Sequence, residues 1–245
     1  MGPSLPADVE PLCQALLHGL RQILGERLVG VYIHGAITFP EGGATGDIDF
    51  HAILAGPPEA AEKSALEALH AGLARDYPPM GAELDGYYIL LADALHSARP
   101  PHLLVPGVYD NSWALHRAHL RAERCIVLHG PEPGQFLPAP SWPELESALR
   151  GELDYVKAHL ADYPAYCVLN LCRLIYSFQT HDVVVSKRAS AAWAVARLPD
   201  WRSLIEAALR SYDQRVADEG SVGSQVAGFF GFACAQIHSA EAETP

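Results

Sequence analysis

The sequence predicts an α+β protein in which a mixed-sheet domain at the N-terminus precedes an all-helical domain at the C-terminus. Two observations favour this class. Four segments with strand character fall in the first part of the chain, at 27–34, 47–55, 82–91 and 124–130. After a proline- and glycine-rich stretch at 130–143, apolar residues recur only at helical spacing. We therefore expect two domains, comprising residues 1–138 and 139–245.

Helices are predicted around and beyond these strands. Residues 8–25 carry apolar side chains at helical spacing and end at a glycine. Residues 56–77 begin with prolines, which suit the first turn of a helix. In the C-terminal domain we expect helices at about 144–160, 164–180, 190–197, 202–218 and 222–238.

The composition is that of a globular protein. The 245 residues are 49% hydrophobic and 19% charged, which permits a sizeable core.

No apolar run approaches the ~18 residues that span a bilayer. The start, MGPSLPADVEPL, lacks the basic and apolar regions of a signal peptide. Five cysteines without a Cys-x-x-Cys pair indicate reduced, buried thiols. We expect a cytoplasmic monomer without a membrane partner.

The formal net charge of −12 argues against a nucleic acid as the main partner, because phosphate backbones attract basic surfaces. An acidic surface favours a small cationic ligand, since it concentrates cations nearby. Solubility alone also accounts for an acidic composition, and this alternative stays open.

Two aspartates stand close together in the segment HGAITFPEGGATGDIDF, residues 34–50. Alternate residues of a strand share a face, so Asp47 and Asp49 project side by side, opposite Ile48 and Phe50. Neighbouring carboxylates are costly unless they are protonated, solvated or bridged by a cation. Mg²⁺ takes one or two carboxylates together with substrate phosphates. The pair therefore indicates a metal site, with a solvated loop as the alternative.

The turn Gly35-Ala36 lies between the first strand and this pair. Such a turn can open a short helix whose backbone N–H groups face an anion. Together with the aspartates, it indicates a site for a metal–triphosphate complex.

These motifs resemble those of a known family. Gly35-Ala36 followed by Asp47-Ile48-Asp49 is similar to the Gly-Ser…Asp-x-Asp signature of nucleotidyltransferases that share the DNA polymerase beta fold. The spacing resembles that of aminoglycoside adenylyltransferases of the streptomycin/spectinomycin type. Residues 166–199 are similar to the helical domain of that family, with a Val-Leu-x-Leu-x-Arg helix, a lysine, Trp-Ala and Arg-Leu-Pro. The resemblance implies Mg²⁺-dependent transfer of AMP from ATP to a hydroxyl of an aminoglycoside, releasing pyrophosphate.

The resemblance also implies roles for individual residues of the catalytic domain. Asp47 and Asp49 would be the Mg²⁺ ligands and Asp85 the general base. The family usually has glutamate at the base position, so Glu83 remains an alternative. Gly35 and Ala36 would face the nucleotide phosphates. Ala36 replaces the usual serine, and the lost hydrogen bond would weaken nucleotide binding by about 1.5–3 kcal/mol.

Other implied roles fall outside this motif. Arg173 and Lys187 match residues that bind the nucleotide phosphates, with an ion pair that ties the domains together as the alternative. Asp162 and Trp113 resemble substrate contacts. Their alternatives are an exposed residue at a helix start for Asp162 and core packing for Trp113.

Three histidines are further candidates for a functional role. His116 and His119 share a helix face, but no third ligand for zinc is evident from the sequence. His51 shares the face of the aspartates, and we expect it to hydrogen-bond Asp47 or Asp49.

Two alternative functions also stay open: the same chemistry on another small alcohol or a protein side chain, and a catalytically weakened nucleotide-binding homologue.

Overall fold

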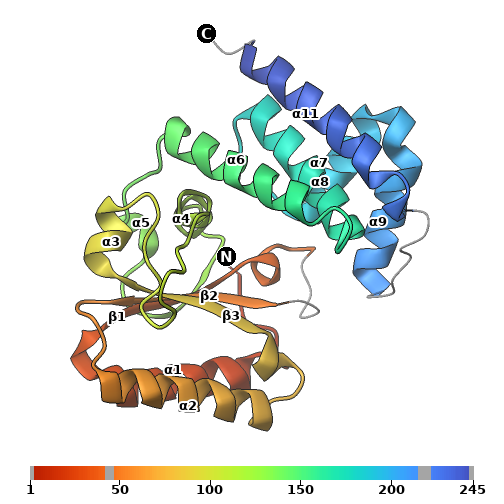
Figure 1. Ribbon diagram of the computed structural model, residues 1–245. Coiled ribbons are helices and arrows are strands. Elements are labelled where there is room, and N and C mark those ends of the chain that lie inside the picture. The colour runs from red at the N-terminus through yellow and green to blue at the C-terminus, as the bar shows by residue number, and fades with distance from the viewer. Residues whose placement is uncertain (1–2, 42–46, 215–221, 243–245) are drawn as a thin grey trace. The chain divides into compact units, whose positions relative to one another are not determined.

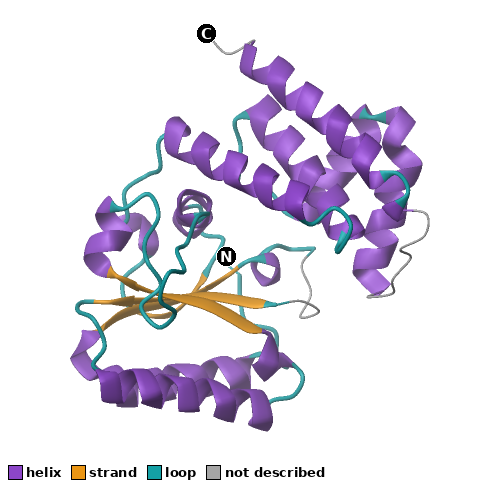
Figure 2. Ribbon diagram, in the orientation of Figure 1, coloured by secondary structure: helices purple, strands orange, loops and turns teal. Residues whose placement is uncertain are grey.

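The computed structural model describes residues 3–41, 47–214 and 222–242. The chain divides into two compact units, Met1–Pro140 and Ser141–Pro245, and each has its own core. The first unit contains a sheet and helices, and the second is helical (Figures 1 and 2). The α+β class predicted from the sequence is confirmed.

The first unit is built on a four-stranded mixed sheet in the order β3-β2-β1-β4. Its strands are β1 (Leu28–His34), β2 (Ile48–Leu54), β3 (Leu84–Leu90) and β4 (Ile126–His129). Strand β1 is antiparallel to β2 and β4, whereas β2 and β3 are parallel. All four predicted strands are present.

Helices cover both faces of this sheet (Figure 2). On one face, α1 (Glu10–Leu24) and α2 (Ala60–Asp76) pack against a core that includes Ile48 and Phe50, as the strand alternation predicted. The other face carries α3 (Leu91–His96) and α4 (Trp113–Arg121), and a short helix, α5 (Pro133–Phe136), follows β4. Helix α3 has six residues, too few to show a helical period, and was not predicted.

The second unit gathers around α7 (Pro164–Thr180). This helix packs against α6 (Trp142–Ala158), α8 (Lys187–Arg197), α9 (Arg202–Gln214) and α11 (Val226–Ala242). Helix α7 is apolar around most of its circumference, which suits a central position. All five helices expected here are present, and Ser141 and Glu144 form a capping box at the start of α6.

The cysteines are free thiols, and four of the five are buried. Burial raises the pKa of Cys13 and Cys172 to about 12, so these thiols stay protonated. Within the described ranges, no helix has both the length and the apolar character needed to cross a membrane.

Candidate active site

The predicted carboxylates lie at one end of β2 and β3. Asp49 pairs in register with Asp85 on the neighbouring parallel strand. Adjacent strands are ~4.8 Å apart and residues in register point to the same face, so the two side chains are neighbours. Asp47 is exposed and immediately precedes β2. The strand register therefore brings Asp85 beside Asp49, although the two residues are distant in the sequence.

Gly35 follows β1 and lies against this group. Its φ of 78° and ψ of −156° belong to a region that essentially only glycine adopts. A Cβ placed on Gly35 would overlap the carboxylate of Asp49. The backbone of the turn and the Asp49 carboxylate are thus in direct contact, which no other residue type at position 35 would permit.

A 3₁₀ helix, Ala36–Thr38, continues from Gly35. Thr38 holds the turn, because its hydroxyl donates to the Gly35 carbonyl oxygen at 2.8 Å. The side chain of Ala36 is exposed. The first N–H groups of such a turn have no earlier helical carbonyl as acceptor, so they are suited to an anion.

The carboxylate set fits a hard divalent cation. Asp47, Asp49 and Asp85 offer only oxygen donors, and Mg²⁺ prefers such ligands. The absence of a side chain at Gly35 lets the Asp49 carboxylate lie against the backbone of the turn, close to the N–H groups that are suited to an anion. The structure is therefore compatible with a Mg²⁺ ion shared between carboxylates and phosphate oxygens.

His51 has different partners from those expected. Its Nδ1 lies 2.8 Å from Nε2 of His34, and its Nε2 lies 2.9 Å from Oδ2 of Asp110. Its hydrogen bonds therefore run to these two residues and not to Asp47 or Asp49. The reason is its position deeper in β2, where its ring faces the segment before α4. Sequence reasoning missed Asp110, because no local pattern relates residues 51 and 110.

Trp113 is completely buried on α4. Its indole Nε1 donates to the Ala94 carbonyl oxygen at 3.2 Å, and its ring centroid lies 5.1 Å from that of His51. A ring without exposed surface offers no face to a ligand. The structure gives Trp113 the core position that the sequence left as its alternative.

The two cations predicted to bind phosphates lie in the second unit. Arg173 on α7 is half-buried, and its Nη2 is 3.8 Å from Oε2 of Glu152 on α6. Lys187 begins α8, with its ammonium 4.4 Å from the ring centroid of Tyr166 and 5.5 Å from that of Tyr212. Aromatic rings favour a cation at this point. The ion pair of Arg173 with Glu152 is internal to the helical unit.

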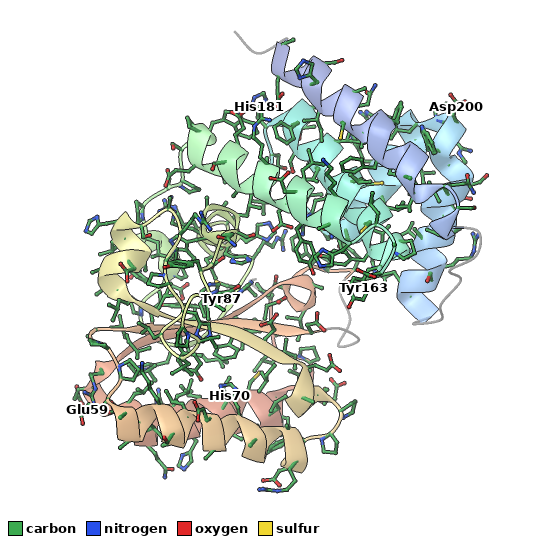
Figure 3. The ribbon with its side chains drawn as sticks, in the orientation of Figure 1. Glu59, His70, Tyr87, Tyr163, His181 and Asp200 are labelled. Carbon is green, nitrogen blue, oxygen red and sulfur yellow. The ribbon has the colours of Figure 1, made fainter. Side chains whose placement is uncertain are left out.

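Asp162 is exposed in the connection between α6 and α7. Its N–H donates to the His159 carbonyl oxygen at 3.2 Å, and the adjacent Tyr163 is also exposed (Figure 3). Its side chain is accessible to a cationic group. The structure is consistent with both interpretations of this residue, and its contact with a substrate remains a prediction.

Comparisons with known proteins agree with this architecture. Residues 138–236 match the family model of the aminoglycoside adenylyltransferase C-terminal domain. The fold is similar to the crystal structure of spectinomycin adenyltransferase AAD(9) from Enterococcus faecialis with ATP and spectinomycin. That match has a TM-score of 0.75 and 15% sequence identity, and it covers 94% of this chain and 99% of that chain. The comparison with curated proteins gives no match.

These findings confirm the resemblance to aminoglycoside nucleotidyltransferases that the sequence indicated. The family match includes α6 to α9 and the residues Asp162, Arg173 and Lys187. The structural match extends the agreement in fold to the sheet unit. The family match supports the predicted enzyme class.

Proposed function

We propose that this protein is a Mg²⁺-dependent nucleotidyltransferase that moves AMP from ATP to a hydroxyl of an aminoglycoside and releases pyrophosphate. The observation that carries the proposal is the position of Asp49, which contacts the Gly35 turn and is in register with Asp85. This arrangement combines a metal ligand, a phosphate-binding turn and a base. The match of residues 138–236 to the adenylyltransferase family supports the same activity.

Each carboxylate has a distinct role in this proposal. Asp47 and Asp49 would hold Mg²⁺, which when bound neutralises charge on the phosphate oxygens. Asp85 accepts the proton of the acceptor hydroxyl, which then attacks the α-phosphorus of ATP as pyrophosphate leaves. A positioned base of this kind contributes typically ~10²–10⁴-fold to the rate.

Two sets of groups are proposed to bind the nucleotide phosphates. N–H groups of the turn that begins with Gly35 and Ala36 bind phosphate oxygens in the sheet unit. Arg173 and Lys187 supply positive charge from the helical unit and stabilise charge that develops on the leaving pyrophosphate. Glu152 forms an ion pair with the Arg173 guanidinium, with 3.8 Å between Oε2 and Nη2.

The acceptor is proposed to be a polycationic aminoglycoside. Exposed carboxylates such as Asp162 would pair with its ammonium groups, and the net charge of −12 favours its approach. The spectinomycin adenyltransferase with a similar fold was solved with ATP and spectinomycin, which makes spectinomycin a reasonable first acceptor to test.

The test is pyrophosphate release from MgATP with streptomycin, spectinomycin and a panel of other aminoglycosides. We expect turnover with one compound, lost in Asp47→Asn, and retained in the control Asp76→Asn, which alters an exposed aspartate on α2. Circular dichroism checks that each variant folds. Absence of turnover with every antibiotic would contradict the aminoglycoside as acceptor, and a panel of other small alcohols would then follow.

A second candidate function is a nucleotide-binding homologue with weakened catalysis. Two residues favour it: Ala36 lacks the usual phosphate-binding hydroxyl, and Asp85 is shorter than the usual glutamate. This function predicts MgATP binding in calorimetry, sensitive to Asp47→Asn, without pyrophosphate release with any acceptor.

A further inference from the structure

A second group of ligand-type side chains lies inside the sheet unit. It consists of His51 on β2, Asp110 in the segment before α4, and His116 on α4. One donor atom from each residue lies within 4.8 Å of the others. Among the residues that the structure describes, no other such group of three histidine, cysteine or acidic side chains is found. We call these three residues the His-Asp-His cluster.

The cluster converges on a single oxygen. Oδ2 of Asp110 lies 2.9 Å from Nε2 of His51 and 2.9 Å from Nδ1 of His116. The other oxygen, Oδ1, accepts the Ser112 N–H at 3.0 Å, which fixes the orientation of the carboxylate. Donor atoms around a tetrahedral zinc ion are roughly 3.3 Å apart, as follows from bonds of ~2.0–2.1 Å. Small side-chain movements would therefore admit an ion.

The surroundings favour a bound cation. His51 and Asp110 are 0% and 1% exposed, so the carboxylate is almost completely removed from water. A buried anion is costly unless positive charge compensates it. The side chain of His116 is 28% exposed and provides an opening for an ion.

The partners of His51 match those of a metal ligand. If Nε2 of His51 binds an ion, its proton resides on Nδ1, which then donates to Nε2 of His34 at 2.8 Å. Metal-binding histidines usually donate their second N–H in this way, which fixes the tautomer. The ring of Tyr87 (Figure 3) stacks on His51 at 5.7 Å between centroids, and Trp113 packs against it at 5.1 Å. The ring is thereby held in one orientation.

We propose that His51, Asp110 and His116 bind one divalent transition-metal ion of the zinc class, separate from the Mg²⁺ site. Two imidazole nitrogens and one carboxylate oxygen are ligands typical of Zn²⁺ and Co²⁺, whereas Mg²⁺ prefers oxygen alone. The ion joins β2, the segment before α4, and α4 itself. Its role is structural and does not depend on the proposed transferase activity.

The test is metal uptake by the untagged full chain after treatment with chelator. Co²⁺ is added first because its visible absorption reports tetrahedral nitrogen and oxygen ligands, and Zn²⁺ is then used to displace it. We expect about one equivalent of Zn²⁺ per chain and a higher melting temperature with the ion than without it, because binding to the folded state stabilises it. His116→Gln should weaken binding at least about 100-fold.

Matched variants separate this cluster from other sites. His119→Gln changes a histidine of the same helix outside the cluster, and Asp85→Asn changes the proposed catalytic carboxylate; both should keep the Co²⁺ absorption. His116 is partly exposed, so its variant is expected to fold even where Asp110→Asn does not. Absence of Zn²⁺ uptake by the unmodified chain overturns the proposal. Unchanged Zn²⁺ affinity in folded His116→Gln also overturns it, because the ion would then lie elsewhere.

Discussion

Ala36 is the residue at which the candidate phosphate-binding turn departs from the pattern of the family it resembles. Its side chain is exposed at the first position of the 3₁₀ helix, so a hydroxyl fits there without repacking. We expect Ala36→Ser to lower the KM for ATP by at least about tenfold, because a hydrogen bond to a charged group contributes about 1.5–3 kcal/mol. Steady-state kinetics at varied ATP and saturating acceptor would measure this.

The matched control is Ala61→Ser on α2, an exposed position remote from the turn. It should leave the KM for ATP unchanged. An equal KM for Ala36→Ser and the unmodified protein would mean that position 36 does not face the phosphates.

At the residue scale, the sequence predicted what local spacing determines. Asp49 lies on the face of β2 opposite the core residues Ile48 and Phe50, and Gly35 occupies a turn whose backbone angles require glycine. The partners of His51 were beyond prediction, because His34 and Asp110 meet it only through strand pairing and the path of a loop. Spacing along the chain carries no signal for such contacts.

At the element scale, the register of β2 and β3 distinguishes two candidate bases. Asp85 lies within β3 and is paired with Asp49, whereas Glu83 ends the 3₁₀ helix before the strand. We expect Asp85→Asn to lower kcat by about 10²–10⁴-fold, since it removes the proton acceptor. Glu83→Gln should change kcat less than about threefold, as expected for a group outside the reaction. The opposite ranking of the two variants would assign the base to Glu83.

The helices and strands themselves were largely predictable, but their pairing was not. Hydrophobic period and turn residues located the four strands and the long helices, with ends that differ by a few residues. The sheet order β3-β2-β1-β4 depends on contacts between distant segments, such as Ile33 with Ile126. These pairings follow from burying both faces of the sheet at once, which no single segment specifies.

The contact between α2 and β3 predicts a dependence of stability on pH. Burial lowers the pKa of His70, whose Nε2 lies 2.7 Å from the Tyr88 hydroxyl. In the unfolded chain His70 binds a proton near pH 6.5, whereas in the folded chain it binds one only at lower pH. The free energy of unfolding therefore decreases as the pH falls below 6.5. We expect the free energy of unfolding in urea, measured with chelator present, to fall from pH 7 to pH 5.

His70→Gln should reduce the dependence of the free energy of unfolding on pH. The reduction should be smaller than about 1.4 kcal/mol per pH unit, which is the change that binding of one whole proton would give. His18→Gln changes a histidine exposed on α1 and serves as the control. If both variants show the slope of the unmodified protein, His70 is not a source of the pH dependence.

At the scale of the whole molecule, the net charge of −12 acts on every ligand that approaches. The field of an acidic protein raises the local concentration of cations, and salt screens it. The Debye length shortens from about 10 Å at ~0.1 M salt to about 3 Å at ~1 M. Under the proposed function, the KM for a polycationic aminoglycoside should therefore rise several-fold over this range, with little change in kcat, because exposed carboxylates such as Asp162 act mainly in capture.

The measurement is kcat and KM at increasing potassium chloride, with an acceptor of lower positive charge as the control. The more highly charged acceptor should show the steeper rise in KM, since its attraction to the protein scales with its charge. Asp162→Asn should flatten that rise if Asp162 contributes to the capture of the acceptor. Equal salt dependence for both acceptors would contradict electrostatic capture, and recognition of the acceptor would then depend on shape and uncharged hydrogen bonds.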